Sequence, residues 1–246
     1  MLVAAAVCPC PPLLVPEVAA GTAPELDAAR AACTDALGVL AAARPDRLVV
    51  VGPGGPVEPV ESAGPVTYPE GTRGSFRSFG VDLDVRLGPA PGPRGEQRLP
   101  YSLAVAAWLL ERTGWSDAPV EGLGVGESGE SLTPEGCART GRDIAARADR
   151  VALLVMGDAS ACRTLKAPGY LDERAAPFDA EVARALGTAD VAALTALDTR
   201  LAHELKASGR APWQVLAGAA EGADLGGSLL YEDAPYGVGY IVATWS

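Results

Sequence analysis

Short apolar runs and segments of helical periodicity alternate along most of the chain. Each apolar run stops at or just before glycine or proline, which is typical of a buried strand. The segments between the runs carry alanine and leucine at helical spacing. Strands that alternate with helices predict an α/β fold, so we expect a single domain over residues 1–246 with a mostly parallel central sheet flanked by helices. The expected strands are residues 1–8, 48–51, 79–87, 119–125 and 150–156, with a last strand or hairpin within 229–245. The expected helices are 24–43, 101–112, a helix that starts at 134, 179–186, 190–207 with a break at Leu197-Asp198, and 212–219.

The first apolar run ends in a proline-rich corner. Residues 1–7 are followed by Cys8, Pro9, Cys10 and Pro11. Proline cannot donate to a sheet ladder and holds the residue before it extended, so the strand must stop at Cys8. Cys10 then lies at the carboxyl end of a strand, which is the edge where open α/β sheets bind ligands. The two thiols are either chemically active there or two small buried side chains in a tight corner.

Composition limits the class of partner. The chain has 246 residues, 48% of them hydrophobic, which is enough for one aliphatic core. A formal net charge of −11 makes binding to nucleic acid or to an anionic membrane unfavourable, and no apolar run has the length of a membrane span. We therefore expect a small-molecule or protein partner, and a homo-oligomer is compatible with the sequence.

The cysteine and histidine counts bear on compartment and chemistry. Five cysteines at irregular spacings, without an export signal, predict reduced thiols and a cytoplasmic protein. The chain has one histidine, His203, in a leucine-rich helical segment where imidazole is usually a packed or surface side chain. An iron site of two histidines and one carboxylate needs two imidazoles, so this chain alone cannot form one.

The run from Gly124 to Gly129 formally matches the dinucleotide fingerprint G-x-G-x-x-G. In a working fingerprint the helix opens at the third glycine, so that its amides meet the pyrophosphate. Here the helix start is expected at residue 134, and Glu127 would repel phosphates. We interpret this run as an ordinary loop between a strand and a helix.

The proline-rich corner resembles the opening of a known superfamily. The run from Ala4 to Val18, AAAVCPCPPLLVPEV, is similar to the start of the class III extradiol ring-cleavage dioxygenase B-subunit (LigB-like) superfamily. In that superfamily the first strand ends in a His-Pro-Pro type turn whose histidine is an iron ligand, and Cys10 stands at that position here. The resemblance implies a LigB-like α/β fold and an ancestry in ring opening with Fe(II).

Two further segments carry the resemblance and differ from it at functional positions. Gly54 stands in the loop where the second iron-ligand histidine of the superfamily falls. Gly157, Asp158 and Ser160 match a Gly-Asp-x-Ser-His type motif, but Ala161 replaces the acid-base histidine. The resemblance implies that both iron histidines and the acid-base residue are missing.

The segment from Trp213 resembles a late Trp-x-x-x-x-Gly-Ala helix of the superfamily. A ligand glutamate precedes that tryptophan in iron-dependent members, and residues 208–210 of this chain, Ser-Gly-Arg, stand in that region. The third iron ligand is therefore also expected to be missing.

One function that fits these replacements is a binding module. It would be a divergent LigB-like protein that has lost the non-haem iron site, needs no cofactor and binds a small molecule or a protein. Its pocket would be formed by strand ends and motif segments, namely Cys8, Pro11, Gly54, Gly157, Ala161, Lys166 and Trp213.

A second function is an enzyme with a cysteine-based centre, whose catalytic residues would be Cys10, Cys162, Asp158 and Ser160. Thiolates bind zinc or copper(I), so Cys8, Cys10 and Cys162 could hold a soft metal. A thiol next to Lys166 or Arg163 could instead act as a nucleophile. Two other hypotheses are residual dioxygenase activity with Fe(II), and a serine hydrolase that uses Ser160 and His203.

These hypotheses make two geometric predictions. The strands that begin near Met1, Leu48 and Arg150 should be central, with carboxyl ends that frame one pocket. Cys10 and Cys162 should face each other across that pocket, close to Asp158, unless Cys162 points into the helix behind its strand and only packs there.

Overall fold

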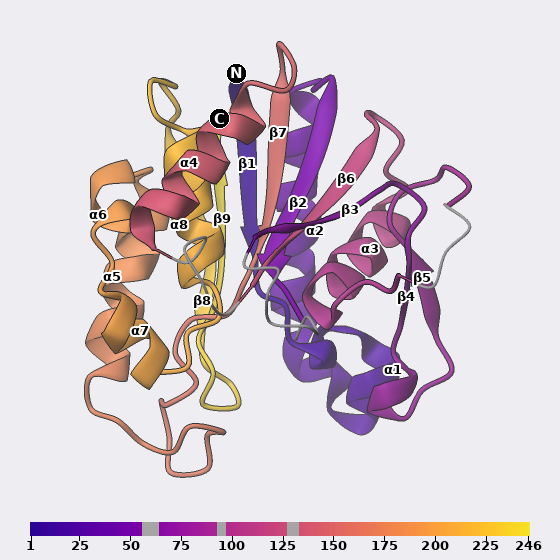
Figure 1. The fold of residues 1–246 in the computed structure, drawn as a ribbon. Helices are drawn as coiled ribbons and strands as arrows, with labels where there is room; N and C mark the ends of the chain where they lie inside the picture. Colours follow the sequence, from indigo (N-terminus) through magenta and orange to yellow (C-terminus); the bar gives the residue numbers. More distant parts are fainter. Residues whose placement is uncertain (56–63, 93–96, 127–132) are drawn as a thin grey trace.

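The computed structural model describes residues 1–55, 64–92, 97–126 and 133–246. Seven strands of these residues form one central sheet in the order β3-β6-β2-β7-β1-β9-β8 (Figure 1). The four central strands are parallel, and the other three pair antiparallel at the edges. The chain is an α/β protein with a mostly parallel sheet, as its sequence predicts. The parallel strands are β1 (Leu2–Cys8), β2 (Arg47–Pro53), β6 (Val120–Val125) and β7 (Val151–Met156), and the others are β3 (Val66–Tyr68), β8 (Gly227–Asp233) and β9 (Tyr240–Trp245).

Helices cover both faces of the sheet, and Figure 1 shows the two layers on its opposite sides. Successive residues of β1 face different layers, because Ala4 and Ala6 belong to one apolar cluster and Ala5 and Val7 to the other. Strands buried on both faces are apolar at nearly every position, which is why the sequence shows continuous apolar runs. One layer contains α2 (Asp27–Ala42) and α3 (Tyr101–Thr113), and the other contains α4 (Pro134–Ala145), α5 (Ala175–Gly187), α6 (Val191–Thr195), α7 (Thr199–Glu204) and α8 (Arg210–Ala219).

Shorter elements complete the layer of α2 and α3. A second sheet of β4 (Arg73–Ser75) and β5 (Asp84–Arg86) packs against α3. The proline corner after β1 continues as a 3-10 turn, Pro12–Leu14, and then as α1 (Pro16–Ala19) and a 3-10 helix, Ala20–Leu26.

One expected strand differs in the structure, and one expected helix break is confirmed. The expected strand over 79–87 is wrong for most of its length, because β5 covers only Asp84–Arg86 and Arg77–Phe79 is a 3-10 turn. Gly80, at φ +87°, ends that turn and interrupts the alternating segment. The segment over 190–207 is divided into α6 and α7 at the expected break, because Asp198 caps α7 by accepting from the N–H groups of Arg200 at 2.8 Å and Leu201 at 2.9 Å.

Helices α4 and α8 cross with their backbones in contact. A Cβ atom added at Gly141 would lie 2.1 Å from the carbonyl oxygen of Val215, and one added at Gly218 would lie 2.2 Å from that of Ala138. These distances are far below van der Waals contact, so neither position accepts a side chain without moving a helix.

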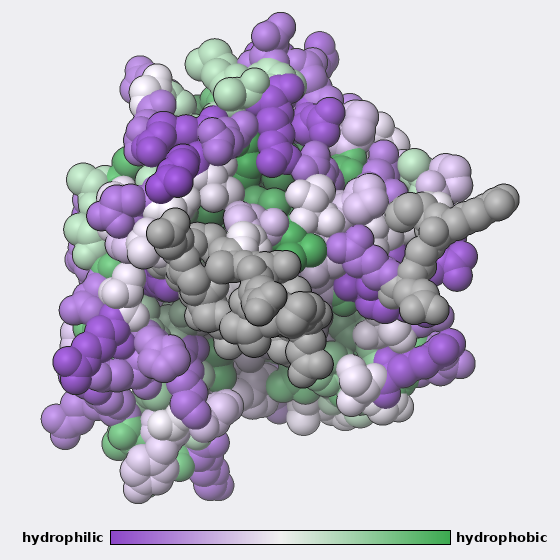
Figure 2. All heavy atoms as spheres, in the orientation of Figure 1, coloured by the Kyte–Doolittle hydropathy of each residue, from purple (hydrophilic) through white to green (hydrophobic). Residues whose placement is uncertain are grey.

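Polar side chains cover much of the surface. Hydrophilic residues predominate on the left flank in Figure 2, over α5 and α7. Leu165 and Tyr170 are exceptions in the segment before α5, at 62% and 63% exposed. Within the described ranges, every helix is too short or too polar to cross a membrane.

Candidate functional site

The carboxyl ends of β2, β7 and β1 lie side by side at the lower end of the sheet in Figure 1. β7 pairs in parallel with both neighbours, and Val155 is opposite Val7 on one side and Val51 on the other. The three strands are central and adjacent, as predicted, but among the described residues the pocket at this edge is lined by β2 and not by β1 or β7, so the prediction that all three frame it is wrong.

Asp158 joins the ends of β1 and β7. One carboxylate oxygen of Asp158 accepts a hydrogen bond from the backbone N–H of Cys10 at 2.8 Å. The backbone N–H of Asp158 donates to Ser208 Oγ at 3.0 Å. The N–H of Gly157 donates to the carbonyl of Cys8 at 3.0 Å and extends the pairing of the two strands. Cys10, Asp158 and Gly157, all expected at the site, therefore lie together.

Burial controls the charge of these groups. It raises the pKa of Asp158 to about 7, although the N–H of Cys10 stabilises the carboxylate and opposes the rise. Burial and the nearby Asp158 raise the pKa of the Cys10 thiol well above its ordinary value, and the Ser208 hydroxyl opposes this only in part. Burial and Asp158 likewise raise the pKa of Tyr240. Cys10 is thus a neutral thiol at pH 7, whereas nucleophilic attack requires the thiolate.

Cys162 does not face Cys10, so the prediction that the two thiols face each other across the pocket is wrong, and Cys162 packs into the helical layer instead. Cys10 belongs to the apolar cluster of α2 and α3, and Cys162 belongs to the cluster on the other face of the sheet. The Cys162 thiol lies 3.5 Å from the carbonyl oxygen of Leu205. The chain turns into the helical layer directly after β7, because the Ser160 N–H donates to buried Asp179 at 2.8 Å and the Ala161 N–H donates to Leu205 O at 2.9 Å.

The proposed soft-metal group of three thiols is not formed either. Cys8 points away from Cys162, and both a hydrogen bond with Cys33 of α2 and burial raise the pKa of the Cys8 thiol well above its ordinary value. No three His, Cys, Asp or Glu side chains come together as metal ligands within the described residues. Cys8 and Cys33 are a buried contact between β1 and its covering helix.

Ser160 is part of a buried polar cluster and is fully inaccessible to solvent. Its hydroxyl donates to Asp179 at 2.9 Å, and Arg163 forms an ion pair with the same carboxylate at 2.9 Å. Ser160 is therefore held inside the protein as a structural contact. The pocket described below is lined by His203 but not by Ser160.

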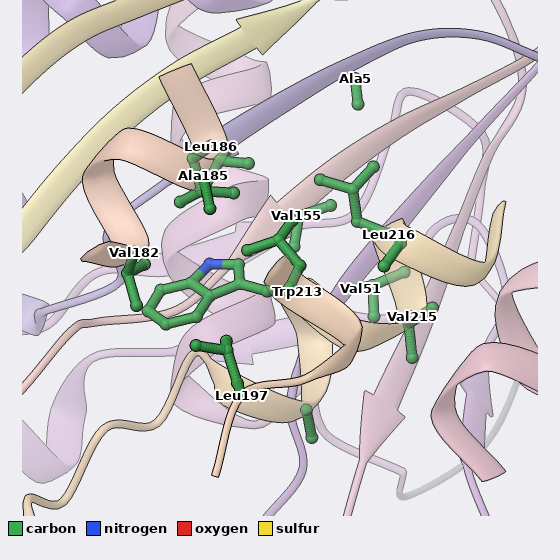
Figure 3. Packing of buried hydrophobic residues seen from close by; sticks show 14 of the residues in the cluster. Ala5, Val51, Val155, Val182, Ala185, Leu186, Leu197, Trp213, Val215 and Leu216 are labelled. Carbon is green, nitrogen blue, oxygen red and sulfur yellow. The ribbon is translucent and has the colours of Figure 1, made fainter. Parts of the chain in front are cut away.

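Trp213, expected in the pocket, lies in the core. Its indole is fully buried among side chains that include Val155, Val182 and Leu197 (Figure 3). A tryptophan ring packs a large apolar area, which explains its position in the layer of α5 and α8. Of the other expected pocket residues, Gly54 follows β2 and its N–H donates a hydrogen bond to the carbonyl oxygen of Val125. Pro11 immediately precedes the 3-10 turn. Ala161 is buried in the turn after β7, and Lys166 is exposed in the segment before α5.

A pocket of about 370 Å³ opens at the shared carboxyl edge. The strands contribute Pro53 of β2 and Val125 of β6, followed by Gly126, and the opposite wall is built by α7 and the start of α8. Ser208 is on this wall and links the pocket to Asp158 and Cys10. The remaining lining residues are Thr199, Ala202, His203, Lys206, Ala207, Arg210, Ala211 and Pro212.

The sequence predicts His203 as a packed or surface side chain, and neither it nor Lys206 nor Arg210 is among the pocket residues expected from the sequence. The available signal was helical spacing. Ala202, His203 and Lys206 follow Thr199 by three, four and seven residues, which is the spacing of one side of a helix. The dinucleotide-like run Gly124–Gly129 reaches the pocket through Val125 and Gly126, and its residues 127–129 lie outside the described ranges.

A larger cavity of about 680 Å³ lies elsewhere, between β5 and the end of α3. Its charged lining is mixed, with Arg73 and Arg86 beside Asp84 and Glu111. It is not at the carboxyl edge of the central sheet, where ligands of open α/β sheets bind, so the smaller pocket is the stronger candidate.

Comparison with known proteins extends the description of the fold. No family model matches the chain, and no curated protein matches its sequence. The crystal structure of the uncharacterized protein JW3007 from Escherichia coli K12 is similar over 99% of both chains, with a TM-score of 0.60 and 16% sequence identity. At this identity the similarity shows that the two chains share an α/β architecture with a mostly parallel sheet flanked by helices.

Proposed function

We propose that this chain is a divergent LigB-like protein that binds a small molecule at the carboxyl edge of its sheet and has lost the iron chemistry of that superfamily. The observation that carries the proposal is the pocket beside Pro53 and Ser208. It opens at the edge where Cys10 and Gly54 stand in place of two iron-ligand histidines. A binding cavity thus accompanies the altered positions.

The donor atoms at this edge do not suit Fe(II). Gly54 and Ala161 carry no ligand atom, and Cys10 offers a buried neutral thiol where the superfamily has an imidazole. Asp158 uses one carboxylate oxygen to hold the backbone of Cys10. Fe(II) in oxygenases takes two histidines and a carboxylate, so these residues are a poor replacement.

The same electrostatics argue against the cysteine-enzyme alternative. An activated cysteine needs a nearby cation or a helix N-terminus to lower its pKa. Cys10 has instead a carboxyl neighbour and a buried position, both of which raise its pKa. A binding role is therefore better supported than thiol catalysis.

His203 provides a direct test because it is the chain's one imidazole and lines the pocket. We expect its Cε1–H resonance to shift saturably with at least one class of small molecule when neutral catechols, organic cations and small anions are titrated separately. The same ligand should raise the melting temperature, since it binds the folded chain alone.

The iron arm of the test uses the same protein without an affinity tag. After anaerobic incubation with Fe(II), we expect no oxygen uptake on a panel of catechols. Robust turnover would contradict the loss of iron chemistry, and a His203 resonance that responds to none of the three ligand classes would contradict the binding role.

A further inference from the structure

The pocket at the carboxyl edge is basic, although the protein is acidic. The chain has 31 Asp and Glu against 20 Lys and Arg. His203, Lys206 and Arg210 nevertheless line the pocket, and none of its described lining residues is Asp or Glu. The charge of the described lining residues is thus opposite to that of the whole molecule, which favours an anionic occupant.

The carboxylate nearest in sequence is directed elsewhere. Glu204 follows His203 in α7 but does not line the pocket. It accepts from Arg174 at 2.8 Å and from Arg200 at 2.9 Å. Its charge is therefore neutralised by arginines that are not pocket residues. Lys206 lines the pocket, and its Nζ donates to the carbonyl oxygen of Pro168 at 3.4 Å.

Lys206 has a backbone conformation that favours glycine. Its φ is +56°, and it follows the end of α7 in a Schellman motif. The N–H of Lys206 donates to His203 O at 3.0 Å, and the N–H of Ala207 donates to Ala202 O at 2.9 Å. Glycine, which lacks a Cβ atom, adopts this conformation without strain.

The start of α8 adds to the positive potential. Arg210, Ala211 and Pro212 line the pocket and form the first turn of this ten-residue helix. A helix N-terminus is the positive end of its dipole. The Arg210 guanidinium is held in place, since its Nη1 donates to Gln214 Oε1 at 3.0 Å.

We infer that the occupant of this pocket carries a phosphate or carboxylate group, which Lys206 and Arg210 bind with His203 beside them. The inference rests on the proposed small-molecule binding and adds the chemical class of the ligand. The shared chemistry is a compact anionic head group with oxygen acceptors. Lys206 would contribute a positive charge and hydrogen-bond donors from the segment after α7, and Arg210 would contribute the same from the start of α8.

The test compares two glycine variants of matched character. Lys206→Gly removes a positive charge from the pocket and relieves a positive φ. Arg44→Gly also removes one positive charge and relieves a positive φ, of +46°, but at an exposed residue outside the pocket. Arg44 precedes β2, at the opposite edge of the sheet. Both variants are expected to keep or raise the melting temperature, because glycine suits this backbone conformation. Lys206→Asn, which also tolerates a positive φ, is a second pocket variant.

The probes are inorganic phosphate and malonate, each titrated at constant ionic strength while the His203 Cε1–H resonance is followed. A saturable shift with phosphate alone, malonate alone or both supports the inference and identifies the head group. Lys206→Gly and Lys206→Asn should weaken that binding at least about tenfold, as expected for loss of a charge-assisted contact. Arg44→Gly should stay within about twofold of the unmodified protein, because screening by salt limits the effect of a distant exposed charge.

Three results would overturn the inference. In the first, neutral catechols or cations shift the His203 resonance but neither phosphate nor malonate does. The proposed binding function then survives, and only the inferred ligand class is wrong. The second is anion binding that is unchanged in both Lys206 variants. A His203 resonance that no compound shifts would remove the inference and the proposed function together.

Discussion

Asp179→Ala is expected to lower the free energy of unfolding by about 3–5 kcal/mol, a typical cost of removing one partner of a buried ion pair. The Asp179 side chain is 2% exposed and accepts from the Ser160 N–H, the Ser160 hydroxyl and Arg163, at 2.8–2.9 Å. Alanine would leave these donors without their acceptor inside the protein. Urea denaturation followed by circular dichroism measures the loss.

Glu181→Ala is the matched control on the same helix. Glu181 pairs with Arg184, but both side chains are about half exposed, at 52% and 48%. Exposed pairs contribute between zero and about 1 kcal/mol, so this variant should be nearly as stable as the unmodified protein. Equal losses in the two variants would show that Asp179 acts as an ordinary surface acid and that the turn after β7 has another anchor.

Asp158→Asn is expected to stabilise the protein at pH 8 and to leave its stability unchanged near pH 4. Burial raises the pKa of Asp158 from its ordinary 3.8 to about 7. At low pH the carboxyl is protonated in both the folded and the unfolded chain. As pH rises from about 4 to about 7, the unfolded chain loses this proton first, so the stability of the folded state falls. Above pH 7 both states are ionised and the full penalty remains, at most about 4 kcal/mol for a shift of this size.

Asparagine removes the charge and keeps an oxygen that can accept the Cys10 N–H. Urea denaturation of both proteins between pH 4 and pH 8 measures the difference, which should grow with pH across this range. Asp35→Asn, at an exposed position of α2, controls for the change in net charge. A loss of stability in Asp158→Asn at pH 8 would mean that the ionised carboxylate stabilises its surroundings more than its burial costs.

The sequence predicts the central sheet because the responsible signal is local. The runs at 48–51 and 151–156 are continuous and apolar, which two covered faces require, and glycine follows each of them. The proline corner likewise places Cys10 at a strand end by covalent geometry alone. Residues 79–87 mislead because alternation is also found in loops, and Gly80 breaks the segment.

The candidate site is only partly predictable because its geometry depends on contacts distant in sequence. Cys162 is turned away from Cys10 by bonds to Leu205 and by the Asp179 cluster, and no nearby residue reveals these partners. Trp213 resembles a motif residue but satisfies the packing needs of the core. Lys206 and Arg210 share a pocket because α7 and α8 both meet the edge of the sheet, which is a property of tertiary packing.

The backbone contact between α4 and α8 has a mechanical consequence for the pocket. At the crossing, Gly141 and Gly218 place backbone against backbone and have no side chains of their own to absorb a displacement. The two helices should therefore move and open as one cooperative unit, not as independent segments. Since α8 carries Arg210 at its first residue, the stiffness of this unit extends to one wall of the pocket. An occupant would meet a pre-organised guanidinium, which lowers the entropy lost on binding.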